Sequence, residues 1–197
     1  MKIGVLALQG DFYLHLKRLR ELEVEAVAVK KPEELADCNG LIIPGGESTT
    51  LVKLLKNIGL YDLLPEFNRE WPIFGTCAGA ILVSREVSNH PIEPLNLIDI
   101  SIERNSYGRQ IDSFDETVEL HLNGSIKTVE GVFIRAPRIT RVGKSVQALA
   151  THNGDVVMVE NEAVLAATFH PELTENRLIH QYFVDKVRKR IYTSRDH

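Results

Sequence analysis

The sequence has little of what would mark a secreted, membrane or nucleic-acid-binding protein. Two of its 197 residues are cysteines, too few for a disulfide framework. No stretch approaches the roughly 18 apolar residues of a membrane-spanning helix. The apolar opening, residues 1–8, is too short for a signal peptide because Gln9-Gly10-Asp11 interrupts it. The formal net charge of −4 argues against general affinity for nucleic acid. We therefore expect a cytoplasmic protein that binds neither membranes nor nucleic acid.

What the sequence does have is enough apolar residues for a substantial core. Hydrophobic residues make up 44% of the chain and charged residues 25%, which at this length favours a single domain over residues 1–197. A basic stretch at residues 186–190 is interpreted mainly as the solvated end of a C-terminal helix, where cations complement the helix dipole. A docking patch is the alternative for that stretch.

The first half of the chain alternates apolar strands with helical periodicity. This pattern predicts a parallel sheet with helices on both faces. Strands are expected at residues 3–8, 24–29, 40–43 and 71–74. Helices are expected near residues 12–22, 48–55 and 60–67, with Ser48 as a plausible N-cap of the second.

The second half changes to alternating patterns and turns. Strands, partly antiparallel, are expected at residues 98–102, 117–120, 131–134, 146–149 and 156–159. Asn123-Gly124 and Asn153-Gly154 are strong hairpin signals. A buried strand at residues 163–169 and an amphipathic helix at 178–187 follow. The predicted fold class is α/β, an open, mostly parallel sheet flanked by helices, with antiparallel strands in the second half.

The most informative motif places a thiol between a strand and a helix. Gly75-Thr76-Cys77-Ala78-Gly79 follows the apolar run 71–74, as in a nucleophile elbow, where side chains at the glycines would collide with the adjoining strand and helix. The Ala78 N–H would point at the same spot from a helix N-terminus, which favours a thiolate and a developing oxyanion. We interpret Cys77 as a nucleophile, although an arbitrary cysteine is more often a small buried hydrophobe.

A thiol nucleophile needs a base, and the base needs an acid that holds it. His170 follows the last predicted strand, and Glu172, two residues on, can project to the same side. We therefore predict that these two residues complete a triad with Cys77. Surface or helix-capping roles are preferred for the remaining histidines: His15, His90, His121, His152, His180 and His197.

Three further segments are candidates for binding a substrate. Residues 44–48 follow the third strand, where ligands of open sheets collect, and Gly46 would supply a second oxyanion N–H. The polar loop 104–110 begins with Arg104, whose guanidinium matches a substrate carboxylate. An ordinary turn is the alternative for the first segment, and a solvated connection is equally open for residues 104–110 and 134–137.

Together, the strand-end clusters resemble those of the triad glutamine amidotransferases. The resemblance runs in order over nearly the whole chain, at residues 4–11, 44–50, 75–79, 103–110, 133–137 and 168–174. Gly-Glu-Ser-Thr-Thr at 46–50 and Arg-Asn-Ser-Tyr-Gly-Arg-Gln at 104–110 are similar to one subfamily, the glutaminase subunits of pyridoxal 5'-phosphate synthase.

This resemblance implies a class I amidotransferase-like (flavodoxin-like) fold and hydrolysis of L-glutamine to L-glutamate and ammonia. Cys77 would attack the side-chain amide, His170 oriented by Glu172 would move protons, and the Gly46 and Ala78 amides would stabilise the oxyanions. The glutamine would be held by Gly46, Glu47, Ser48, Arg104, Ile134 and Arg135.

The resemblance also implies a partner. The ammonia would pass to a separate synthase subunit, which builds the pyridoxal phosphate ring from a pentose phosphate and a triose phosphate. The family suggests that Gln9-Gly10-Asp11 lies near that subunit. This chain itself would bind no cofactor and no metal.

Two other readings of the elbow stay open. One is a cysteine hydrolase or peptidase of similar fold, which gives no reason for the Arg104 loop. The other is a non-catalytic regulatory subunit, in which Cys77 would not react selectively with a glutamine-mimicking electrophile.

Overall fold

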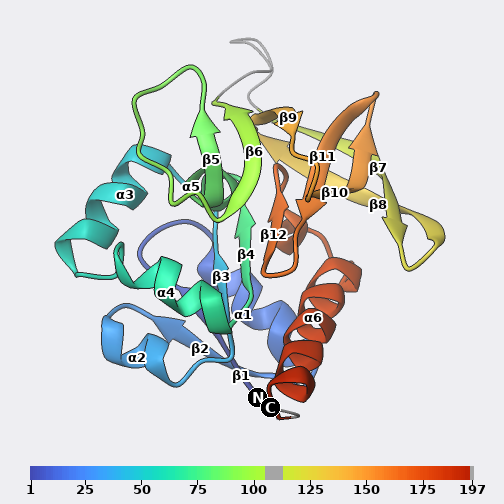
Figure 1. Cartoon of the computed structure of the whole chain (residues 1–197). Coiled ribbons are helices and arrows are strands. Elements are labelled where there is room, and N and C mark those ends of the chain that lie inside the picture. Colours follow the sequence, from blue (N-terminus) through green and yellow to red (C-terminus); the bar gives the residue numbers. More distant parts are fainter. Residues whose placement is uncertain (105–112, 196–197) are drawn as a thin grey trace.

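A nine-stranded sheet runs through the protein, whose computed structural model describes residues 1–104 and 113–195 (Figure 1). Five strands pair in parallel, in the order β2 (Glu25–Val29), β1 (Lys2–Leu6), β3 (Gly40–Ile43), β4 (Ile73–Thr76) and β12 (Val164–Ala167). Four strands continue the sheet in antiparallel fashion, namely β11 (Asp155–Glu160), β10 (Gln147–His152), β7 (Ser113–Leu122) and β8 (Ser125–Ile134). The predicted α/β class with a mostly parallel first half is confirmed.

Two apolar clusters cover the two faces of the sheet. Alternate strand residues divide between them, as the two-residue period of a strand requires. In β3, for example, Ile42 belongs to the first cluster, whereas Leu41 and Ile43 belong to the second.

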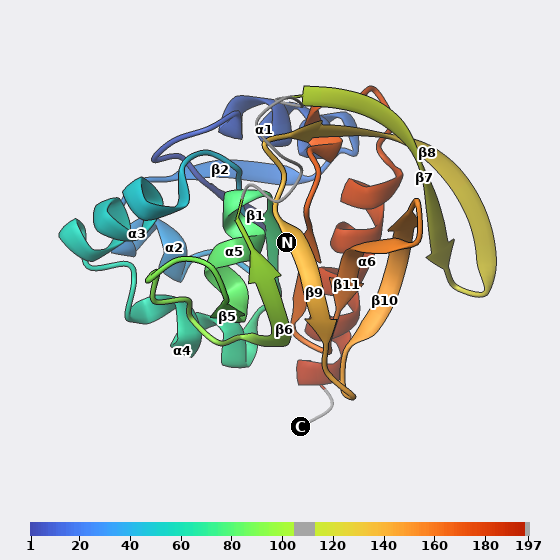
Figure 2. The same ribbon diagram turned by 90° about the horizontal axis from the view of Figure 1, so that it is seen from above.

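Helices and a small second sheet complete the layers. The first cluster includes residues of α1 (Phe12–Glu21) and α6 (Leu178–Arg195). The second includes residues of α2 (Pro32–Ala36), α3 (Ser48–Asn57), α4 (Leu63–Glu70) and α5 (Ala78–Val83), and of the sheet β5 (Ser84–Val87), β6 (Ile98–Glu103) and β9 (Arg138–Val142). Figure 2 shows α2, α3 and α4 on one side of the molecule and α6 on the other.

Both predicted hairpin turns are present. Asn123 and Gly124 have φ angles of 50° and 76°, and Asn153 and Gly154 have 49° and 85°. Positive φ at both central residues is what a type I′ turn requires, which is why Asn-Gly is the favoured pair. The two turns join β7 to β8 and β10 to β11.

The predicted N-cap of α3 is wrong, and two other helices extend beyond their predicted ends, since α4 ends at Glu70 and α6 at Arg195. Ser48 is the first residue of α3, and the N-cap is Glu47, whose carboxylate accepts hydrogen bonds from the backbone N–H groups of Thr49 (3.0 Å) and Thr50 (2.7 Å). A carboxylate has two oxygens and so satisfies two of the unpaired N–H groups at the helix start, where a serine hydroxyl would satisfy one.

Candidate active site

Cys77 lies at the turn between β4 and α5, with strained backbone angles of φ 49° and ψ −107°. The flanking glycines make the turn possible. A Cβ on Gly75 would lie 2.5 Å from the backbone of Gly79, and a Cβ on Gly79 would collide with the carbonyl oxygen of Ile43. The predicted nucleophile elbow is therefore present, and backbone packing requires both of its glycines.

His170 and Glu172 follow β12, the parallel neighbour of β4. His170 Nδ1 lies 2.7 Å from Glu172 Oε1, and both residues are buried. Burial alone would lower the pKa of His170, but its hydrogen bonds with the Cys77 thiol and the Glu172 carboxylate raise the pKa to about 10. The imidazole is therefore cationic at neutral pH and lies beside the Cys77 thiol.

Gly45 brings the loop after β3 against the Cys77 side chain and the His170 imidazole. A Cβ on Gly45 would lie 2.6 Å from His170 Cε1 and 3.1 Å from Cys77 Cβ. Any side chain here would displace the imidazole or the thiol. The loop that follows β3 thus packs directly on the thiol and the imidazole.

A cavity of about 310 Å³ opens beside Cys77. Eight of the ten predicted site residues line it, together with Gly10, Asp11, Gly45 and Ile81: Gly46, Glu47, Ser48, Cys77, Arg104, Ile134, Arg135 and His170. The other two predicted residues, Ala78 and Glu172, do not line the cavity. Ala78 is the buried first residue of α5, and Glu172 is fully buried next to His170. The structure therefore gathers the predicted residues at one place.

The oxyanion loop predicted at Gly46 packs on the loop after β1. Gly46 has a φ of 133°, and a Cβ there would lie 2.6 Å from Gln9 Nε2. The Gln9 amide donates a hydrogen bond to the carbonyl of Glu47 (2.9 Å). Gly46 is thus needed both for its backbone angle and for this close approach.

Glu47 and Arg104 form an ion pair in the cavity, with Arg104 Nη2 2.9 Å from Glu47 Oε1. Partial burial would raise the pKa of Glu47, but hydrogen bonds from Thr49 and Thr50 lower it to about 2. Asn89 fixes the backbone of Arg104, since it accepts from the Arg104 N–H and donates to the Arg104 carbonyl, each at 2.9 Å. The remainder of the predicted loop, residues 105–110, lies outside the described part of the chain.

The end of β8 completes the cavity. The Cys77 thiol lies 3.9 Å from the carbonyl oxygen of Ile134, a weak sulfur hydrogen bond. Arg135, the next residue, is exposed and has a φ of 41°. This segment brings a backbone carbonyl close to the Cys77 thiol.

Residues 5–189 match the model of the SNO glutamine amidotransferase family. The chain belongs to this family. It is 50% identical over 190 residues to the pyridoxal 5'-phosphate synthase subunit PdxT of Thermosipho africanus, covering 96% of this chain and 100% of the relative. The PdxT of Brevibacillus brevis is 47% identical over 190 residues, covering 96% and 98%.

Solved structures agree with this SNO family fold. A crystal structure of a glutamine amidotransferase is 44% identical, with a TM-score of 0.88 over 94% of this chain and 98% of that one. A putative GMP synthase protein from Thermoplasma acidophilum has a TM-score of 0.75 over 99% of this chain and 98% of that one. At 18% identity, the second likeness shows the fold alone.

The histidines are where sequence reasoning about this SNO family chain went wrong. Three that were expected at the surface or at caps are buried: His15, His152 and His180. His15 lies against the far side of Glu172, with its Nε2 3.3 Å from Glu172 Oε2. The signal in the sequence was weak, because His15 occupies an ordinary position in an amphipathic helix.

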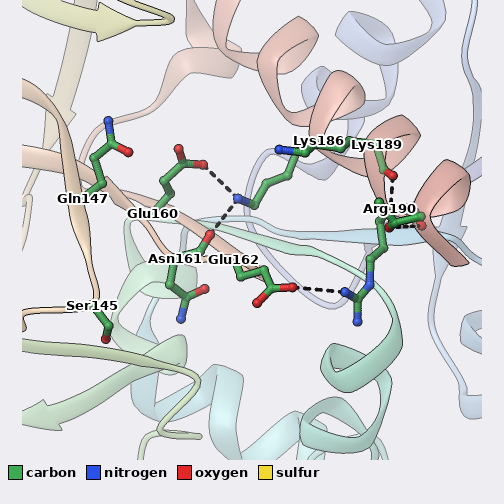
Figure 3. Close-up of a pocket in the computed structure, with 9 residues that line it drawn as sticks. Ser145, Gln147, Glu160, Asn161, Glu162, Lys186, Lys189 and Arg190 are labelled. Atoms are coloured by element: carbon green, nitrogen blue, oxygen red, sulfur yellow. Dashed lines mark hydrogen bonds and ion pairs between the residues drawn. The ribbon is translucent and has the colours of Figure 1, made fainter.

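The basic stretch of this amidotransferase lines a second cavity of about 500 Å³ (Figure 3), which shares no lining residue with the cavity beside Cys77. The stretch is not the end of the helix as expected, because α6 continues to Arg195, and part of its charge is neutralised by acidic side chains. Lys186 Nζ lies 2.8 Å from Glu160 Oε2, and Arg190 Nη1 lies 3.3 Å from Glu162 Oε1. This cavity is therefore not a concentrated positive site.

The described residues include neither a cluster of metal ligands nor a membrane-spanning helix. Within residues 1–104 and 113–195, no three His, Cys, Asp or Glu side chains are grouped as metal ligands would be. None of the helices in those ranges is both long enough and apolar enough to cross a membrane.

Proposed function

We propose that this chain hydrolyses L-glutamine to L-glutamate and ammonia through a Cys77–His170–Glu172 triad. One observation carries this proposal: the strained Cys77 elbow adjoins a buried, hydrogen-bonded His170–Glu172 pair at the edge of a cavity that contains a charged Arg104–Glu47 pair. A nucleophile, an oriented base and groups of both charges are what hydrolysis of an amino acid amide needs.

In the first half of the reaction, the Cys77 thiolate attacks the side-chain amide carbon of glutamine. The carbonyl oxygen becomes an oxyanion, which the backbone N–H groups of Gly46 and Ala78 stabilise. His170 then gives its proton to the amide nitrogen, the carbon–nitrogen bond breaks, and ammonia leaves. A glutamyl thioester on Cys77 remains.

In the second half, neutral His170 takes a proton from a water molecule that attacks the thioester carbonyl. A second oxyanion forms at the same two amides and collapses to the side-chain carboxylic acid and the Cys77 thiolate, and the acid loses its proton to water to give glutamate. His170 is again cationic, so the resting state is restored. Glu172 stabilises the imidazolium in both halves through the hydrogen bond at Nδ1.

The cavity fits the zwitterionic end of the substrate. The Arg104 guanidinium would take the α-carboxylate, because its forked N–H groups match a carboxylate. The Glu47 carboxylate stays ionised at neutral pH and would attract the α-ammonium group. Ser48 and the backbone at Gly46, Ile134 and Arg135 would hold the rest of the molecule.

The two cysteines offer a matched test of the nucleophile. Cys77→Ala is expected to abolish release of glutamate from glutamine. Cys38→Ala should retain it, because Cys38 is buried in the core and burial raises its thiol pKa to about 11. Unchanged turnover in Cys77→Ala, measured as glutamate formed over time, would refute the assignment.

We further propose that the ammonia passes to a pyridoxal 5'-phosphate synthase subunit in the cytoplasm. The support is the match along 95% or more of this chain to relatives that are named as a subunit of that synthase. The test is a glutaminase assay with and without the candidate synthase subunit. With the subunit present, we expect glutamate release to be much faster and pyridoxal 5'-phosphate to form with glutamine as the nitrogen source. A rate of glutamate release that is the same with and without the subunit would contradict the partnership.

A further inference from the structure

A buried pair of histidines extends the row of close polar contacts beyond Glu172. His15, from α1, has its Nε2 3.3 Å from Glu172 Oε2 and its Nδ1 2.9 Å from Nε2 of His180, from α6. All three side chains have 0% exposure. The chemical steps proposed above use neither histidine, and neither lines the cavity beside Cys77.

The protons in this cluster can be placed. Burial would raise the pKa of Glu172, but its hydrogen bond and charge interaction with the cationic His170, together with the facing imidazole of His15, hold the pKa below its usual value, so the carboxylate is ionised. Burial lowers the pKa of both His15 and His180, so each ring is neutral with one N–H. The His15 proton belongs on Nε2, facing the carboxylate, because a lone pair there would repel it. His15 Nδ1 is then the acceptor for the N–H of His180 Nε2.

The contact of His15 with Glu172 is important because it involves the second carboxylate oxygen, Oε2. Among the described residues, Glu172 Oε2 has no conventional hydrogen-bond partner, although it is fully buried. A buried carboxylate oxygen with nothing to balance its charge is costly. The imidazole of His15, 3.3 Å away, supplies that balance. It also opposes rotation of the carboxylate, and such a rotation would break the 2.7 Å contact of Oε1 with His170.

The surroundings of the pair hold it in place. Thr76 Oγ1 lies 3.4 Å from His15 Nε2, and the ring of Phe74 packs edge-on against both imidazoles, with centroids 6.4 and 6.3 Å away. The other charged groups that act on the pair are Asp11 and His170 on His15, and Arg18 on His180. The cluster is thus rigid and enclosed.

We propose that His15 is a positioning residue for the triad, and that His180 fixes its tautomer. His180 donates to His15, the N–H of His15 faces Glu172 Oε2 at 3.3 Å and balances its charge, and Glu172 orients His170 toward Cys77. The proposal rests on the triad assigned under "Proposed function". It adds a requirement for a donor at one defined atom, the position of His15 Nε2.

Two amide substitutions at His15 separate this role from simple packing. His15→Gln places an amide nitrogen near the position of Nε2 and can donate to Glu172. His15→Asn carries the same amide nearer to Nδ1 and cannot reach Glu172. We expect kcat for glutamine hydrolysis to fall about tenfold in His15→Asn with KM within about twofold, as for other supporting hydrogen bonds. His15→Gln should retain at least half of the wild-type kcat.

The pH profile supplies a readout that a purely structural role would not move. Loss of a donor to an ionised carboxylate raises its pKa. The acidic limb of kcat/KM should therefore shift to higher pH in His15→Asn but not in His15→Gln. Equal loss in both variants, or wild-type kcat and an unshifted limb in His15→Asn, would overturn the proposal.

Controls separate failure of this inference from failure of the proposed function. Wild-type protein must hydrolyse glutamine and Cys77→Ala must not, which tests the triad chemistry first. Thermal unfolding must show that both His15 variants are folded. If His15→Asn does not fold, His180→Gln and His180→Leu take its place, since only the former keeps a donor to His15 Nδ1. Retention of kcat by His180→Gln and its loss in His180→Leu supports the proposal, whereas equal kcat in the two overturns it.

Discussion

The guanidinium of Arg104 and the carboxylate of Glu47 lie 2.9 Å apart inside the cavity that contains Cys77. Glu47 is also the N-cap of α3, so Thr49 and Thr50 hold its carboxylate in one orientation. The ion pair is thereby built on a rigid helix start. A substrate that enters with its own carboxylate and ammonium group meets both charges already in place.

Substitution of Arg104 tests this arrangement. Arg104→Ala should raise KM for glutamine by about 10- to 100-fold, because hydrogen bonds to charged groups contribute about 1.5–3 kcal/mol. Arg85→Ala is the matched control, since Arg85 forms an exposed surface pair with Asp99 (3.0 Å). Steady-state kinetics of glutamate formation measure both. Equal KM values in the two variants would show that Arg104 does not bind the substrate.

The strain at Cys77 predicts that glycine at this position gives a more stable protein than alanine. Cys77→Gly should be inactive but more stable than Cys77→Ala by about 1 kcal/mol, because glycine adopts positive φ without strain. At Cys38, which is not among the positive-φ residues, glycine should instead be less stable than alanine. Urea unfolding of the four variants measures the difference. If the difference in unfolding free energy between the glycine and alanine variants had the same sign at both positions, the elbow would not be strained.

The packing of Gly79 against Ile43 predicts a large loss of stability. Gly79→Ala should lower the free energy of unfolding by about 3 kcal/mol, since its Cβ would collide with a backbone carbonyl that cannot move away. Gly124→Ala has open space around its Cβ and only the cost of positive φ, about 1 kcal/mol. Denaturant midpoints distinguish them, and comparable losses would contradict the role of close packing at the elbow.

The raised pKa of His170 predicts how stability depends on pH. Since the folded pKa of about 10 lies above the ordinary value of 6.5, the charged ring stabilises the fold fully below pH 6.5. This contribution is lost as pH rises through 10. The stability difference between wild type and His170→Asn should therefore shrink from about pH 6 to about pH 10. His121→Asn, an exposed control on β7, should show no such trend. A constant difference for His170→Asn would refute the raised pKa.

Local sequence signals predicted the elements that lie near the active site. Residues 40–43 form the strand that their apolar run indicates, and the Asn-Gly pairs form their turns because positive φ is a property of those residues themselves. Cys77, His170 and the Gly46 loop were found because each follows a strand of the parallel part of the sheet, which brings them together. Ile134 and Arg135 were expected there only from the family resemblance. Strand ends, glycine spacing and turn residues can all be read without knowing the fold.

The strands and buried histidines that were not predicted depend on partners far away in the chain. β9 is short, mostly exposed and polar, and it becomes a strand because β6 offers it an edge. The four residues after α5, Ser84–Val87, form β5, which was not among the predicted strands. His15 and His180 lie 165 residues apart, and each taken alone has an ordinary place in a helix. Their burial follows from the packing of α1 and α6, which no local pattern reveals.

The pairing of β12 with β4 also dictates when the protein becomes an enzyme during its synthesis. Cys77 leaves the ribosome well before His170, and chains are made from the N-terminus onward. A nascent chain that ends before β12 has an elbow but neither the imidazole nor its carboxylate partner, and β4 has a missing neighbour in the sheet. Under the proposed mechanism, the thiol acquires its base only when the last strand is inserted, so we expect an unfinished chain to release no ammonia.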